Sequence, residues 1–138
     1  MQLSRDKSAP VVLYVDDDAD DRMLFVDALQ HAAPGYIVET ANDGYQAMDF
    51  LNRRRTSLPC LVILDLNMPV MNGKELMHKL KNDEEFRLIP MVVFTTSSNP
   101  DDRRKCAQYG VDMLTKPINY SDLTRIVKQL LSYCKVEV

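Results

Sequence analysis

The sequence contains few of the residues and runs that mark several classes of protein. Its 138 residues include three cysteines, four glycines, two histidines and no tryptophan. No apolar run approaches the roughly 18 residues of a membrane span, and the N-terminal segment MQLSRDKSAP lacks the apolar core of a signal peptide. A net charge of −3 argues against the basic surface of a nucleic-acid-binding protein. We therefore expect a cytoplasmic protein that binds neither nucleic acid nor membrane.

The three cysteines, Cys60, Cys106 and Cys134, lie far apart and include no C-x-x-C pair. Such spacing is typical neither of a metal site nor of a disulfide framework. Cys60 precedes an apolar run, so we expect it to be a small core residue, the usual place of a free cysteine.

What the sequence does contain is an alternation of short aliphatic runs with amphipathic segments. The runs cover residues 11–15, 36–41, 60–64, 89–95 and 111–115. Three of them are almost continuously apolar, as in central strands of a parallel sheet that is covered on both faces. The run 36–41 alternates more and is expected nearer an edge. This pattern predicts an α/β, doubly wound fold with a five-stranded parallel sheet. We expect residues 1–9 to form a flexible arm and residues 10–138 a single domain.

Helices are predicted between these runs from caps and apolar spacing. Two are expected over 44–55 and 120–133, the latter with a strong apolar stripe. Asn72 can cap another, and Asn99 followed by Pro100 gives a cap and a proline at the first helical position. The helix after Pro100 has few apolar residues, which makes it a candidate for movement.

Polar residues stand at the carboxyl ends of the predicted strands, where open α/β sheets bind their ligands. They are Asp16, Asp17 and Asp18 after the first strand, Asp65 after the third, Thr95 after the fourth and Lys116 after the fifth. We expect Asp18 to cap the following helix and the other acids to face the site. Crowded carboxylates repel one another unless a cation joins them, and an all-oxygen site suits Mg²⁺.

This set of residues favours phosphoryl chemistry. A carboxylate beside Mg²⁺ can attack phosphorus and form an aspartyl phosphate. The metal and Lys116 would neutralise the transferring oxygens, and Thr95 could bind one of them. Taken alone, Thr95 could be an ordinary strand-end residue and Lys116 a solvated loop lysine.

Four segments resemble the receiver domain of two-component response regulators, and the resemblance runs from Val11 to Cys134. They are VLYVDDD, VILDLNMPVMNG, VVFTTSS and LTKPI. The resemblance implies a CheY-like, flavodoxin-like (βα)5 fold with strand order 2-1-3-4-5. The segments TSSNPDD and KNDEEFRLIP are similar to stand-alone regulators associated with phytochrome-type kinases.

The resemblance also implies a role for each site residue. Asp16, Asp17 and Asp65 would bind Mg²⁺ together with the main-chain carbonyl of Asn67. Asp65 would be the phosphoacceptor, Thr95 the switch hydroxyl and Lys116 the amine that contacts the phosphate.

Two further expectations concern the segment around Lys116. The Lys116–Pro117 bond is commonly cis in this family. Met113 stands where the family usually has an aromatic residue that moves with the threonine, and Tyr109 and Tyr120 are the neighbours that could supply one.

We therefore expect a stand-alone phosphoacceptor signalling domain and not a metabolic enzyme. Its donor would be a histidine kinase or a phosphotransfer protein, and its output would pass by contact to an unknown downstream protein. Homodimerisation is left open. One alternative is a degenerate, unphosphorylated receiver that serves as a scaffold. A poorer one is a haloacid-dehalogenase-like phosphohydrolase, which needs a second acid where this chain has Asn67.

Overall fold

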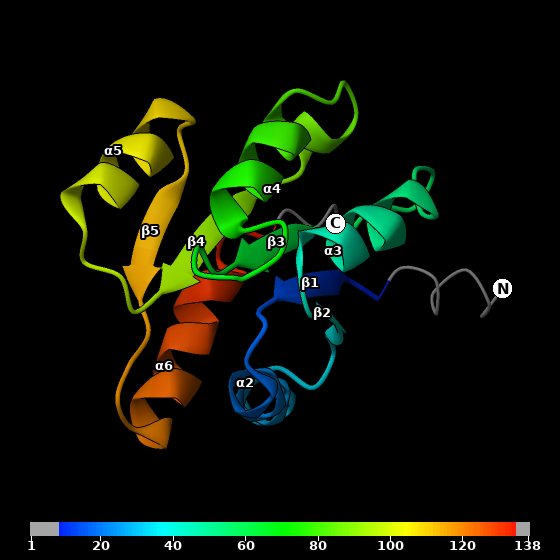
Figure 1. Ribbon diagram of the computed structural model, residues 1–138. Coiled ribbons are helices and arrows are strands. Elements are labelled where there is room, and N and C mark those ends of the chain that lie inside the picture. The colour runs from blue at the N-terminus through cyan, green and yellow to red at the C-terminus, as the bar shows by residue number, and fades with distance from the viewer. Residues whose placement is uncertain (1–8, 135–138) are drawn as a thin grey trace, which may run out of the picture.

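A single parallel sheet organises the protein (Figure 1). The computed structural model describes residues 9–134. The strands are β1 (Val11–Val15), β2 (Ile37–Ala41), β3 (Leu61–Leu64), β4 (Met91–Thr95) and β5 (Asp112–Thr115). Their order is β2-β1-β3-β4-β5, with every neighbouring pair parallel. The predicted fold class, strand order and edge position of the second strand are confirmed. The expected N-terminal arm falls almost entirely outside the described residues.

Helices cover both faces of this sheet. They are α2 (Ala19–Ala32), α3 (Gly44–Asn52), α4 (Gly73–Lys81), α5 (Pro100–Gln108) and α6 (Tyr120–Leu131), with a short 3-10 helix η1 (Phe86–Leu88) before β4. Figure 1 shows α2 and α6 on one side and α3, α4 and α5 on the other. Strand residues alternate between the two cores: Leu13 and Val15 pack with the α3–α5 layer, whereas Val12 and Tyr14 pack with α2 and α6.

The predicted caps are present, but two predicted helix ends are wrong. Asn72 caps α4 in a capping box with Glu75, and Asn99 caps α5. The helix expected to reach residue 133 ends at Leu131, and the helix expected to reach residue 55 ends at Asn52. Beyond it, Arg55 forms ion pairs with carboxylates from the segment that follows α4. These contacts join residues distant in sequence, so local spacing could not predict them.

The expectation that Cys60 is a free core cysteine is also wrong. Cys60 and Cys134 form a disulfide with a Cα–Cα distance of 4.9 Å, which ties the start of β3 to the chain just after α6. The fold brings together two residues that are 74 positions apart, and cysteine spacing alone does not reveal such a pair. Cys106 on α5 is a buried free thiol.

Two further observations bear on the sequence-based expectations. Within residues 9–134 no peptide bond is cis, so the cis bond expected at Lys116–Pro117 is not found. X–Pro bonds favour trans by about 0.5–1 kcal/mol unless the surrounding structure selects cis. In the same part of the chain, no helix combines the length and the apolar character needed to cross a membrane.

Candidate functional site

Asp16 lies directly after β1 and is fixed by hydrogen bonds to its main chain and its carboxylate. Its main-chain N–H donates to the carbonyl of Ala41 on the neighbouring strand, at 3.0 Å. Its carboxylate accepts hydrogen bonds from the Tyr14 hydroxyl (3.1 Å) and from the main-chain N–H of Asp18 (3.0 Å). Only 1% of Asp16 is exposed. Asp18 caps α2, as predicted, by accepting from the N–H of Asp21.

Asp65 is brought beside Asp16 by the pairing of β3 with β1. Its main-chain N–H donates to the carbonyl of Val15 at 3.0 Å, which continues the ladder between the two strands. The main-chain N–H of Lys116 likewise donates to the carbonyl of Thr95 at the end of β4. Parallel strands thus deliver the predicted residues to one edge of the sheet.

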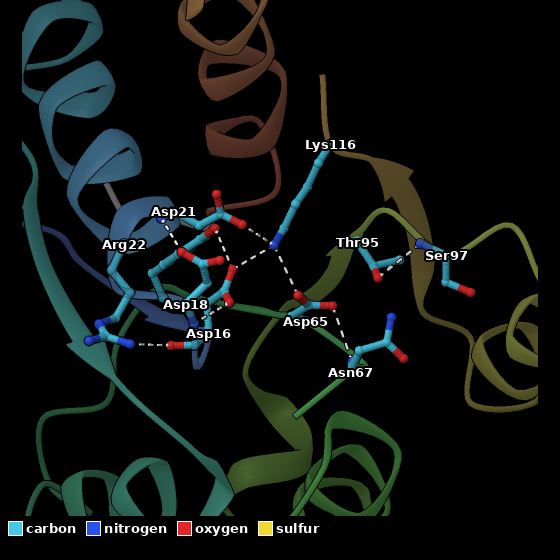
Figure 2. Close-up of polar contacts among 10 residues, drawn as sticks. Asp16, Asp18, Asp21, Arg22, Asp65, Asn67, Thr95, Ser97 and Lys116 are labelled. Atoms are coloured by element: carbon cyan, nitrogen blue, oxygen red, sulfur yellow. Dashed lines mark hydrogen bonds and ion pairs between the residues drawn. The ribbon is translucent and has the colours of Figure 1, made fainter. Parts of the chain in front are cut away.

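The Lys116 ammonium group joins the acids from different elements (Figure 2). Its Nζ donates to Asp16 (2.6 Å), Asp21 (2.8 Å) and Asp65 (2.9 Å). The lysine side chain is 10% exposed, and the carboxylates of Asp16 and Asp65 are 1% and 9% exposed. Asp21 is more exposed, with 36% of its side chain accessible. An ion cluster that is buried except at Asp21 therefore connects β1, α2, β3 and the loop after β5.

The charges of this cluster do not cancel, because three carboxylates face one ammonium group. Burial lowers the pKa of Lys116, but hydrogen bonds to the three carboxylates outweigh that effect and raise its pKa above the ordinary value. Burial also raises the pKa of Asp16, and the opposing hydrogen bond from Lys116 does not cancel the rise. The site thus carries surplus negative charge that a cation would relieve.

The remaining predicted residues lie around this cluster with different degrees of contact. The main-chain N–H of Asn67 donates to Asp65 at 3.2 Å, while the Asn67 side chain is exposed. Thr95 is fully buried, and its hydroxyl accepts from the main-chain N–H of Ser97 at 3.2 Å (Figure 2). Asp17 is exposed, and its side chain bonds to no other residue of the described segment 9–134.

The donor set fits a divalent cation without forming a complete cage. No three His, Cys, Asp or Glu side chains among the described residues are arranged to hold a metal ion. Mg²⁺ does not need such a group, because it typically takes one or two carboxylates and keeps several waters. Asp16 and Asp65, linked through Lys116 and carrying excess negative charge, suit that mode of binding.

Sequence reasoning missed several residues at this edge of the sheet. Asp21 and Tyr14 contact the cluster directly. Asp21 was recognisable as an acid in the first turn of the helix that follows the acidic run. Asp102 gave no such signal, because a buried acid on a polar helix looks like any exposed one. It is 3% exposed and accepts a hydrogen bond from Ser97.

The two tyrosines that could replace the expected aromatic lie in different places. Met113 pairs with Val93 in the β4–β5 register and is partly buried against the core on the α3–α5 side. Tyr109 packs against the same core, and its hydroxyl lies 2.5 Å from Nδ1 of His78. Tyr120 is exposed at the start of α6 and donates to Asp27. Only Tyr109, of these two, shares the surroundings of Met113.

Comparisons with known proteins all indicate the same family. The sequence model described as "Response regulator receiver domain" matches residues 12–128. The probable methanogenesis regulatory protein FilR2 of Methanothrix harundinacea is 35% identical over 127 residues, which cover 89% of this chain and 82% of that protein.

Two solved structures are similar over nearly the whole chain. The phosphorylated cyanobacterial phytochrome response regulator RcpA is 33% identical, with a TM-score of 0.82 and coverage of 91% of this chain and 93% of that one. The Mn²⁺-bound response regulator Rcp1, known from Synechocystis, is 32% identical, with a TM-score of 0.80 and coverage of 94% and 97%. The resemblance to phytochrome-associated regulators noted from the sequence is thereby confirmed.

Proposed function

The chain belongs to the family of response regulator receiver domains, and on that premise we propose that Asp65 accepts a phosphoryl group in a signalling reaction. The donor is the phosphohistidine of a histidine kinase or of a phosphotransfer protein. An Asp65 carboxylate oxygen attacks phosphorus, the phosphorus–nitrogen bond breaks and the imidazole leaves. The protein thus promotes only its own phosphorylation and dephosphorylation, as a signalling domain and not as a metabolic enzyme.

The observation that carries this proposal is the position of the Lys116 ammonium group. It bonds to Asp65 and Asp16 at once, within a cluster that is mostly withdrawn from water. A fixed cation beside the attacking carboxylate stabilises the negative charge of the transferring oxygens. It needs no reorganisation at the moment of reaction, because the strands and loop already hold it there.

Mg²⁺ completes the charge balance in this proposal. Asp16, Asp17, Asp65 and the main-chain carbonyl of Asn67 would hold it, and it would supply electrostatic stabilisation of the phosphoryl oxygens. The fit rests on the all-oxygen donor set and on the three carboxylates that face a single ammonium group. That the similar regulator Rcp1 was crystallised with Mn²⁺ supports a divalent ion here.

Thr95 acts in the same proposal as the hydroxyl that binds a phosphoryl oxygen. In the structure its Oγ accepts the N–H of Ser97, which leaves the Thr95 O–H free to donate. A movement of Oγ toward the phosphoryl group would stretch the bond from Ser97, and the chain after β4 would then carry the state of Asp65 to the surface of α5. We assign the output to protein contact through α5, β5 and α6, in the cytoplasm, with the downstream partner and homodimerisation left open.

A small phosphodonor tests this function without knowledge of the partner kinase. The protein is incubated with acetyl phosphate, with and without Mg²⁺, and its intact mass is measured for wild type and Asp65→Asn. The proposal predicts one added phosphoryl group that depends on Mg²⁺ and is lost in the variant. A wild-type protein that gains no phosphoryl group, and binds no beryllofluoride either, would support an unphosphorylated scaffold instead.

A further inference from the structure

Helix α5 is held to the rest of the protein by unusually few buried side chains. Of its nine residues only Asp102 and Cys106 are buried. One of these two anchors is therefore a carboxylate, 3% exposed, on a helix that presents little apolar surface to the core. A buried charge is tolerated only when it is paired and hydrogen-bonded, so the partners of Asp102 decide how this helix is attached.

Asp102 has two partners, and each comes from a different element. Nζ of Lys74, in the first turn of α4, lies 2.6 Å from Oδ1, and Oγ of Ser97 donates to Oδ2 at 2.5 Å. The ion pair with Lys74, as the larger cause, and the hydrogen bond from Ser97, as the second, hold the pKa of Asp102 below its usual range. We call Lys74, Asp102 and Ser97 the Asp102 network.

The network reaches the candidate site through Ser97. The main-chain N–H of Ser97 donates to the Thr95 hydroxyl at 3.2 Å, and the Ser97 hydroxyl in turn accepts the N–H of Asn99, the cap of α5. The other end of the network, Lys74, lies next to Gly73, whose N–H bonds to the carbonyl of Leu66 just after Asp65. The network thus spans the chain after Asp65 and the chain after Thr95.

We infer that the Asp102 network is a positioning device that holds the Ser97 N–H against the Thr95 hydroxyl and so opposes phosphorylation of Asp65. This inference rests on the proposed function, since it supposes that Thr95 must turn toward a phosphoryl group. In the described arrangement the Ser97 N–H donates to the Thr95 oxygen, so a turn of that oxygen toward the phosphoryl group must stretch or break this bond. Loosening Ser97 lowers the cost of releasing it, and a ligand that needs the released state then binds more tightly.

Two variants break the network at different points. Ser97→Ala removes the hydroxyl that ties the loop to Asp102 but leaves the Ser97 main-chain N–H and the Lys74–Asp102 pair. Lys74→Met removes the cation on α4. The conservative variants Ser97→Thr and Lys74→Arg keep the hydroxyl and the positive charge, respectively. Lys79→Met is the matched control, because it removes the same charge from an exposed position on the same helix.

The measurement is the affinity for beryllofluoride at saturating Mg²⁺, with Mg²⁺ affinity determined separately for every variant. Ser97→Ala and Lys74→Met should bind beryllofluoride about fivefold more tightly or better, the lower range of ordinary allosteric coupling. Their Mg²⁺ affinity should equal that of wild type. A variant that damaged the carboxylate cluster would instead change the Mg²⁺ affinity. Ser97→Thr, Lys74→Arg and Lys79→Met should behave as wild type.

The results that would overturn the inference can be told apart from a failure of the proposed function. Beryllofluoride affinity that is unchanged or weaker in Ser97→Ala shows that the network does not oppose the switch. Should Lys74→Met fail to fold, with the Asp102 charge left unpaired, Ser97→Ala alone decides. If wild type itself binds no beryllofluoride, the proposed function fails and the inference fails with it, whereas a failure confined to the variants leaves the proposed function intact.

Discussion

Gly73 is the position where a single added methyl group should most directly disturb the candidate site. A Cβ at this residue would lie 2.1 Å from the main-chain oxygen of Asp65 and 2.6 Å from Cα of Leu66. Non-bonded carbon and oxygen approach to about 3.3 Å, so the two segments must separate by about 1.2 Å. Asp65 cannot yield freely, because its N–H is bonded to Val15 on the central strand β1.

Gly73→Ala should therefore lower both stability and phosphorylation. Overpacking of this kind typically costs about 1–3 kcal/mol of unfolding free energy, which urea denaturation measures. A misplacement of about 1 Å in a reacting group can cost about 100-fold in rate. We expect a loss of that order in the initial rate of phosphorylation by acetyl phosphate, followed by intact mass at saturating Mg²⁺.

Two other glycines provide controls for this experiment. Gly35→Ala adds a methyl group with no heavy atom within 4 Å, so it should leave the phosphorylation rate unchanged. Gly44→Ala meets the Met71 side chain, with Cγ and Sδ at 2.6 Å and Cβ at 2.7 Å. The flexible end of methionine can yield but its Cβ cannot move freely, so a loss of stability is expected here as well. A Gly73→Ala protein with wild-type stability and rate would refute the argument that this glycine sets the position of Asp65.

Three more predictions concern charge and cross-linking. Lys116→Met leaves its three carboxylates without their ammonium partner, so it should lower the free energy of unfolding in urea by about 3–5 kcal/mol. Added Mg²⁺ should recover part of this loss. If Mg²⁺ does not change the stability of the variant, that result counts against a cation site. Reduction of the Cys60–Cys134 disulfide, which spans 74 positions, should cost about 4.4 kcal/mol by the chain-entropy relation. Equal urea midpoints with and without reductant would contradict the cross-link. Hydrogen bonding to Arg55 lowers the pKa of Asp83 to about 2 from 3.8, so this pair stabilises the fold above about pH 3.8 and the contribution is lost as the pH falls toward 2. Asp83→Asn should flatten that part of the stability–pH curve, and an unchanged slope would show that the pair contributes nothing.

The parts of the fold that follow from local pattern were predictable, and the parts that depend on long-range contacts were not. Apolar runs and helix caps gave the alternating architecture, and Asn72 and Asn99 cap the helices expected of them. The length of α3 and the Cys60–Cys134 pairing depend on which distant segments meet. No spacing rule within the sequence contains that information.

The residues of the candidate site likewise include some that could be predicted from the sequence and some that could not. Asp16, Asp65 and Lys116 follow strands, and since parallel strands end at one edge, their convergence could be expected. Asp102 could not be recognised, because only the packing of α5 against α4 makes its carboxylate buried and paired. The resemblance marked Met113 as the position of the usual aromatic residue, but only the folded structure shows that Met113 and Tyr109 pack against the same core.

The position of the phosphoryl group on the chain can be determined chemically. After incubation with acetyl phosphate and Mg²⁺, borohydride reduces an aspartyl phosphate to homoserine, and peptide mass spectrometry identifies the altered position. We predict homoserine at position 65, dependent on Mg²⁺ and absent without phosphodonor. Homoserine at position 16 or 17, or at no position in a protein that has gained a phosphoryl group, would contradict the assignment of Asp65 as the phosphoacceptor.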